Sequence, residues 1–388
     1  GAAGASISTG DLKFNVTSVD GGAILGTHSV VNITTKNVDA TLTANYGGGN
    51  SSGGVAQYGL LTGSTVSSGE TLDTGEYSTI TTMNLKLNQT TTGGSTTPIL
   101  NNGIRAIQGA TSNATLPNGG RGTAGQVIVN GILDMTLTGN RSVGIYVSGN
   151  ATNHGVATDR APVFNALTPK VILNNDATII INKGTGSSFT TWDSHGIKLG
   201  KVRYAGEGPG ILESHGNLVI DTTNALQGGG IKMMRNSILD ASDSNASTTI
   251  KTNGYALEIG GHDDAARNGF VLTYEQAASN GATASFNNAI FTTNGTSVDP
   301  LITATGARKD LMFVDQGQVA VKLNFTGANT DLTANANGYI LNVSGNYTAP
   351  NYAYYSNTYD TLGNPVQGQN LFEGSSVTFN ATDAGSMT

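Results

Sequence analysis

The densest group of ionisable residues in the sequence is His262, Asp263 and Asp264, with Arg267 close behind. Paired carboxylates beside a basic residue can cleave polysaccharides, because one carboxyl group holds a proton while the other is ionised. Two glycines precede this group and an Asn-Gly pair follows it, which favours a solvent-exposed loop insertion. We interpret the group as a loop, and a polysaccharide hydrolase or lyase remains the alternative function.

Two further motifs match catalytic patterns only in their letters. Residues Gly49–Gly53 spell G-x-S-x-G, but they lie in a Gly/Ser/Asn-rich stretch without the strand and helix that a nucleophile elbow needs. Residues Gly120–Gly125 spell a dinucleotide-binding fingerprint, yet they lead into an expected strand rather than a helix. The five histidines are dispersed and cysteine is absent, so no zinc site or thiolate nucleophile is predicted. We therefore assign no catalytic residue, no metal and no cofactor.

Basic residues recur at matched distances after glycine–isoleucine pairs. Lys198 and Lys201 lie two and five residues after one such glycine, and Lys232 and Arg235 lie at the same distances after another. If these repeats stack, Lys198 lies beside Lys232 and Lys201 beside Arg235, with Arg203 close by. Like charges on neighbouring strands repel, so such a row favours an anion site. Carboxylated or sulfated glycans are the expected ligands.

A solvated edge, neutralised by Glu207 or Glu213, is the alternative interpretation of these basic residues. Arg105 also lies two residues after a glycine that precedes an isoleucine, Gly103.

Tyrosines are concentrated near the end of the chain, where five of the 13 lie between residues 347 and 359. Tyrosine combines an apolar ring with a hydroxyl group, which suits sugar stacking and protein interfaces. Tyr352, Tyr354 and Tyr355 are therefore candidate contact residues. We favour a second interpretation, in which residues 347–388 form a C-terminal cap that hides strand edges.

Composition and periodicity predict an all-β chain. Only 12 % of residues are charged, 54 of 388 are glycine, and Thr, Asn and Ser occupy positions where a helix favours Ala, Leu, Glu or Lys. One short helix or loop is expected over 272–278. Alternating apolar residues predict half-buried strands at Leu12–Val16, Val38–Leu42 and Val319–Phe325. The net charge of −7 argues against a nucleic-acid partner.

An internal repeat narrows the all-β class. The segments Val127–Leu137, Val171–Ile181 and Ile211–Ile220 align without gaps, and each has an apolar strand, a small or polar corner and a second strand. A glycine followed by an apolar residue comes later in each repeat; these pairs are Gly144-Ile145, Gly196-Ile197 and Gly230-Ile231, and Gly103-Ile104 and Gly254-Tyr255 resemble them. Such repeats favour one β-solenoid domain over residues 1–388.

At about 20–25 residues per coil, we expect roughly 16–18 coils with loop insertions and a rod near ~80 Å. A propeller or an array of sandwiches is the alternative architecture, but the recurring Trp-Asp pair of propeller blades is missing. Asn and Thr at equivalent positions are expected to form hydrogen-bonded ladders along the stack.

This strand–corner–strand unit with its later glycine–isoleucine pair resembles the right-handed parallel β-helical passenger domains of type V autotransporters, the pertactin-like and AIDA-like group. The absence of cysteine and the richness in Thr, Asn and Gly are similar to that family. The resemblance extends from about residue 10 to 380. It implies export through the periplasm to the bacterial cell surface, with the signal peptide already removed and the membrane contacted only through a translocator barrel that this chain lacks.

The resemblance also implies a function. It identifies the chain as a surface adhesin, attached to the outer membrane or released, whose partners are host glycans, extracellular matrix proteins or identical molecules on neighbouring cells. Low charge density favours such self-association, because little repulsion separates the rods. A purely structural stalk is a third expectation.

Overall fold

A computed structural model of the chain describes residues 5–18, 21–26, 30–46, 56–63, 77–93, 100–108, 123–149, 168–185, 194–200, 209–233, 237–259, 282–297, 310–315, 321–336, 338–344, 377–381 and 386–387. These residues form strands β1 to β27 and no helix, so the all-β prediction is confirmed for the described part of the chain. It likewise holds no helix that could cross a membrane. The helix or loop expected over 272–278 lies outside the described residues.

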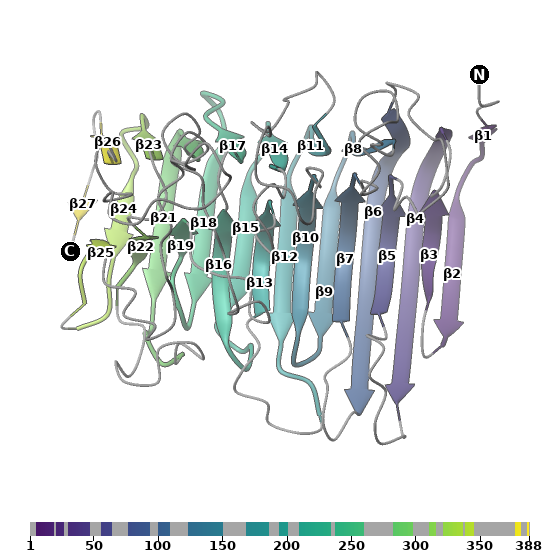
Figure 1. Ribbon diagram of the computed structural model, residues 1–388, viewed down its shortest axis with the longest axis horizontal. Helices are drawn as coiled ribbons and strands as arrows, with labels where there is room; N and C mark the ends of the chain where they lie inside the picture. Colours follow the sequence, from purple (N-terminus) through teal and green to yellow (C-terminus); the bar gives the residue numbers. More distant parts are fainter. Residues whose placement is uncertain are drawn as a thin grey trace, which may run out of the picture.

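The strands belong to two sheets in which every described pairing is parallel (Figure 1). The nine-stranded sheet contains β3 (Gly21–Gly26), β5 (Ala56–Thr62), β7 (Leu100–Ile107), β10 (Ser142–Ser148), β13 (Ser194–Leu199), β16 (Gly228–Met233), β19 (Leu257–Ile259), β22 (Met312–Asp315) and β25 (Leu341–Ser344).

The other sheet has eighteen strands in two rows that share β4 and β6. The first row contains β1 (Ala5–Ser8), β4 (Val31–Tyr46), β6 (Tyr77–Gly93), β8 (Ala124–Val129), β11 (Lys170–Leu173), β14 (Ile211–Ser214), β17 (Ile238–Ala241), β20 (Thr283–Phe286), β23 (Val321–Phe325) and β26 (Val377–Ala381). The second row adds β2 (Leu12–Thr17), β9 (Leu133–Thr138), β12 (Ala177–Asn182), β15 (Leu218–Thr222), β18 (Ser247–Thr252), β21 (Asn288–Thr293), β24 (Asp331–Thr333) and β27 (Ser386–Met387).

Each turn of the chain passes through both rows of the eighteen-stranded sheet and then through the nine-stranded sheet. Successive turns stack in parallel, so the predicted parallel β-helix is confirmed. The expected 16–18 coils are not found, because the nine-stranded sheet gives nine coils in the described part of the chain. The coils use more residues than expected. The step between paired residues is 26 from Lys232 to Glu258 and 55 from Leu257 to Met312.

The register of the predicted repeat is largely confirmed. Val171 pairs with Val127, and Ile181 pairs with Leu137. The third segment is one residue out, because Leu212 rather than Ile211 pairs with Val171. A shift of one residue moves a side chain to the other face of a strand, and it is Leu212 that lies in the core.

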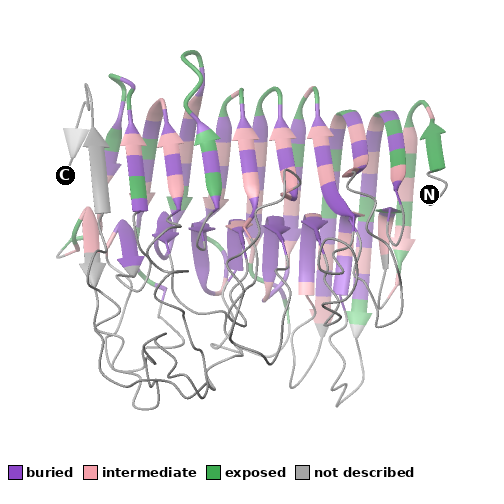
Figure 2. Cartoon of the chain, turned by 45° about the horizontal axis from the view of Figure 1, so that its top comes forward, coloured by how far each residue is buried: buried purple, intermediate pink, exposed green. Residues whose placement is uncertain are grey.

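Inward-facing side chains stack into one continuous apolar core between the two sheets. Ile80, Val127, Val171 and Leu212 occupy successive coils of the first row, and all four are fully buried. Figure 2 shows the resulting pattern, in which buried bands alternate with partly exposed ones along the eighteen-stranded sheet. Burial of these rows removes apolar surface from water in every coil and is the main source of stability.

The glycine–isoleucine pairs mark the place where the nine-stranded sheet approaches the opposite wall. A Cβ atom on Gly196 would lie 2.3 Å from Ile220 Cγ2, and one on Gly144 would lie 2.5 Å from Ile179 Cγ2. At these two positions a side chain would overlap the opposite wall. Gly254-Tyr255 does not belong to the row, because Leu257 is the residue that pairs with Ile231.

Asparagine ladders stabilise the corner between the two rows of the eighteen-stranded sheet, as expected from the sequence. Asn84 Nδ2 donates to Asn37 Oδ1 at 2.7 Å, and Asn37 Nδ2 donates to Asp11 Oδ1 at 2.7 Å. Asn174 Nδ2 donates in the same way to Asn130 Oδ1 at 2.8 Å. Each bond joins neighbouring coils, so the ladder holds the corners in register.

Candidate functional site

The structure places the central pair of the predicted basic row as expected. Lys198 on β13 pairs with Lys232 on β16, and the same row contains Arg105, Tyr146 and Glu258. We call these five residues the Arg105 row. They face outward from the nine-stranded sheet, because the isoleucine or leucine that precedes each of them points into the core. Lys201, Arg203, Arg235 and the candidate tyrosines Tyr352, Tyr354 and Tyr355 lie outside the described residues.

The ring of Tyr146 separates the first two cations of this row, Arg105 and Lys198. The Arg105 guanidinium lies 5.5 Å from the Tyr58 ring centroid and 5.1 Å from that of Tyr146. Its Nη1 atom also donates to Tyr58 Oη at 3.0 Å. On the next coil, Lys198 Nζ lies 5.3 Å from the Tyr146 centroid. Tyr146 therefore contacts a cation on either side.

The third cation is neutralised by a carboxylate that the sequence analysis missed. Lys232 Nζ lies 2.9 Å from Glu258 Oε1, and both side chains are buried. Of the two expected partners, Glu213 lies on β14 of the other sheet, and Glu207 lies outside the described residues. The sequence feature that could have identified Glu258 is Ala256, which occupies the glycine position of the repeat in this coil. Glu258 follows two residues later and is therefore level with Lys232.

The Arg105 row is only partly accessible. Tyr146, Lys232 and Glu258 are buried, whereas Arg105 and Lys198 are half-buried. Any anion that binds this row therefore meets Arg105 and Lys198 first. With three cations and one carboxylate, the row carries a net positive charge in a chain whose formal net charge is −7.

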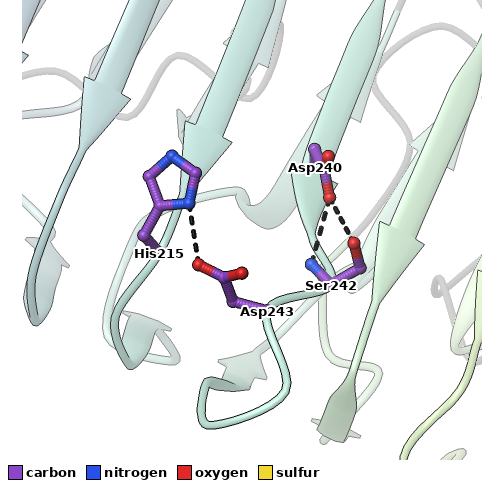
Figure 3. Close-up of polar contacts among 4 residues, drawn as sticks. All are labelled: His215, Asp240, Ser242 and Asp243. Carbon is purple, nitrogen blue, oxygen red and sulfur yellow. Dashed lines mark hydrogen bonds and ion pairs between the residues drawn. The ribbon is translucent and has the colours of Figure 1, made fainter.

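A histidine, a serine and two aspartates lie close together at a corner of the coil (Figure 3). His215 Nδ1 lies 2.8 Å from Asp243 Oδ2, while Ser242 Oγ donates to Asp240 Oδ1 at 2.6 Å. The hydroxyl group is thus bonded to the carboxylate that does not contact the histidine, so these residues do not form the relay that activates a serine nucleophile.

The Asp240–Ser242 contact belongs to a type of side-chain turn that recurs along the chain. Asp221 accepts from the backbone N and hydroxyl group of Thr223, and Asn294 accepts in the same way from Thr296. The same side-chain turn therefore ends several strands of the second and first rows. We interpret the residues in Figure 3 as part of this corner structure.

The other candidate surface is the outer face of the eighteen-stranded sheet at β2, β4, β6 and β9. Three rows of outward side chains cross these four strands, and every member is exposed or half-buried. The charged row contains Lys13, Asp39, Lys86 and Asp134; the amide–hydroxyl row contains Asn15, Thr41, Asn88 and Thr136; the threonine row contains Thr17, Thr43, Thr90 and Thr138. We call these twelve residues the polar face.

Comparisons with known proteins find no match to the chain among protein-family models, curated proteins or solved structures. Within the described residues, no group of three or more His, Cys, Asp or Glu side chains is arranged to hold a metal ion. The acidic group at His262–Arg267 and the G-x-S-x-G stretch lie outside those residues. Two surfaces remain for interpretation: the partly accessible Arg105 row and the exposed polar face.

Proposed function

We propose that this chain is a bacterial surface adhesin of the autotransporter-passenger kind, which attaches cells to one another and to host glycans or matrix proteins. The observation that carries the proposal is the polar face, an exposed, regular array of hydroxyl, amide and charged groups on the outer side of a parallel β-helix. Such a surface offers many weak contacts of the same kind at about 4.8 Å intervals.

Adhesion by this face is multivalent. A single hydroxyl or amide contact adds little net free energy in water, because it replaces a contact with solvent. Many copies displayed on one cell raise the effective concentration for the next contact, so weak sites together hold two surfaces. The resemblance to autotransporter passengers supports display at the outer membrane, and the β-helical architecture fits it.

The test is display of the chain on a non-adherent bacterium. We expect clumping of the cells, binding to a panel of glycans and matrix proteins, or both. Cells that display a folded, non-adhesive domain at the same density serve as the control. If cells bearing the chain neither clump nor bind more than the control, the adhesin proposal is wrong and a structural stalk is favoured.

A second candidate activity is the binding of acidic glycans by the Arg105 row. The favouring observation is that the half-buried Arg105 guanidinium and Lys198 ammonium groups lie on either side of the Tyr146 ring, since such cations pair with carboxylate or sulfate. Lys198→Gln is expected to lower the salt concentration that elutes the chain from immobilised heparin. Lys251→Gln, on the exposed face of β18, is the matched control. Equal elution of both variants would contradict glycan binding at this row.

A further inference from the structure

The charged row of the polar face alternates in sign from coil to coil. Lys13 pairs with Asp39, Asp39 with Lys86, and Lys86 with Asp134. No ion pair joins any two of these four side chains in the part of the chain that the structure describes. The next residues of the row are Thr178 and Val219, so the alternating pattern is confined to four coils and about 14 Å.

The amide–hydroxyl row beside it also alternates from coil to coil, between amide and hydroxyl groups. Asn15 pairs with Thr41, Thr41 with Asn88, and Asn88 with Thr136. An amide offers two donors and an acceptor, and a hydroxyl group offers one donor and two lone pairs. The two side-chain types are therefore complementary as hydrogen-bonding partners.

Each of the two rows is complementary to a second copy of itself that runs in the opposite direction along the β-helix. We infer that two copies of the chain dock face to face through the polar face with their long axes antiparallel, related by a two-fold axis that runs along the strands between Asp39 and Lys86. This inference rests on the proposed adhesive function and names its partner, a second copy of this chain. In this arrangement the same surface serves both molecules, as a two-fold interface requires.

The two-fold places complementary groups together at every position of these two rows. Lys13 meets the partner's Asp134, and Asp39 meets the partner's Lys86. In the adjacent row, Asn15 meets the partner's Thr136 and Thr41 the partner's Asn88. Opposed sheets pack about 10 Å apart, a separation that long and short side chains of these types span together.

Parallel docking in register gives the opposite result. It brings Lys13 against the partner's Lys13 and Asp39 against the partner's Asp39, and juxtaposed like charges oppose association. The charge pattern therefore selects both the partner and its orientation. Each contact is exposed and weak alone, so docking depends on many copies and weakens as salt screens the charges.

A charge-swapped variant tests the inference. It carries Lys13→Asp, Asp39→Lys, Lys86→Asp and Asp134→Lys, which keeps the alternation within the chain and reverses every sign. In antiparallel docking, the variant fits itself and the original chain fits itself, but a mixed pair places like charges together. A smaller variant, Asp39→Lys with Lys86→Asp, also fits itself and repels the original chain at its two central positions.

The measurement uses beads of two colours, one coated with the original chain and the other with a swapped variant, at low ionic strength. We expect clumps that separate by colour, with mixed contacts about tenfold rarer than contacts of one colour. Circular dichroism and thermal unfolding confirm that each coated chain is folded, and the smaller variant serves if the fourfold one is not.

Three outcomes would overturn the inference: clumps that mix the colours at random, a preference for mixed contacts, or no clumping of beads that bear the original chain. The second outcome indicates parallel docking. The third, together with binding of displayed chain to glycans or matrix proteins, leaves the adhesin proposal intact while removing the second copy as its partner.

Discussion

The ammonium group of Lys232 lies 2.9 Å from the carboxylate of Glu258, and the two side chains are 5 % and 8 % exposed. This pair joins two neighbouring coils on the outer side of the nine-stranded sheet. Glu258 is the one carboxylate among the five residues of the Arg105 row, and it contacts Lys232. The ion pair explains how Lys232 can be buried beside Lys198, since the negative charge of Glu258 offsets part of the repulsion between the two lysines.

Removing one member of this pair is expected to destabilise the fold more than removing both. Glu258→Gln leaves a buried ammonium group without its carboxylate, which should lower the free energy of unfolding by about 3–5 kcal/mol. The double variant Lys232→Met with Glu258→Leu removes both charges at similar volume and should recover most of that loss. Chemical denaturation measures the three free energies. A double variant as unstable as Glu258→Gln would show that packing, rather than charge, dominates here.

Position 196 is expected to tolerate no side chain. A Cβ atom at position 196 would lie 2.3 Å from Ile220 Cγ2 and 3.0 Å from Gly230 O, so Gly196→Ala should cost about 1–3 kcal/mol through overpacking. Gly10→Ala is the matched control, because a Cβ atom there meets nothing within 4 Å. Thermal unfolding compares the two, and equal midpoints would contradict the close approach of the sheets.

Tyr77 is expected to make stability depend on alkaline pH. Burial raises the pKa of its hydroxyl group above 10.0, and the negative charge of Glu213 raises it further. Because the folded chain holds this proton more tightly than the unfolded chain, the contribution is complete below pH 10 and is lost as the pH rises further.

The corresponding experiment compares Tyr77→Phe with the original chain in denaturation curves between neutral pH and strong alkali. Phenylalanine cannot ionise, so the variant should lose less stability above pH 10, although it lacks the 3.0 Å hydrogen bond to Thr168 at every pH. Tyr339→Phe, at a residue that is 69 % exposed, is the control. Parallel curves for the original chain and Tyr77→Phe would contradict the expected role of Tyr77.

The corner ladder is expected to contribute measurably to stability. Asn84 donates to Asn37 at 2.7 Å and accepts from the backbone N of Ile132 at 2.8 Å, so Asn84→Ala removes two bonds between coils. A loss of about 1–2 kcal/mol is expected. Asn88→Ala, four residues along the same strand on the outer face, is the control and should change the monomer little. A loss at Asn88 equal to that at Asn84 would contradict the ladder's role.

The sequence alone predicts the β-helical architecture because the features that indicate it lie within short segments of the chain. Alternating runs predicted the strands, and the glycine–isoleucine pairs fixed the register closely enough to place Lys198 beside Lys232. The glycine–isoleucine pairs give the wrong register where alanine replaces the glycine. Aligning Gly254 with Gly230, in place of Ala256, hides Glu258 as the partner of Lys232.

The polar face could not be found from the sequence because its members recur without a fixed period. Asp39 follows Lys13 by 26 residues, while Lys86 follows Asp39 by 47. The number of coils is overestimated because the step from one coil to the next reaches 55 residues, from Leu257 to Met312, where about 20–25 were expected. Only the pairing of strands in three dimensions brings these alternating charges into one row.

The unequal steps between coils have a consequence for how such a chain can change. A step of 26 residues and one of 55 lead into strands that pair in the same way and fill the same interior. Insertions can therefore lengthen one connection while the strands of the coils before and after it stay paired. In a protein of this architecture, the connections can evolve in length and sequence independently of the strands that form the core.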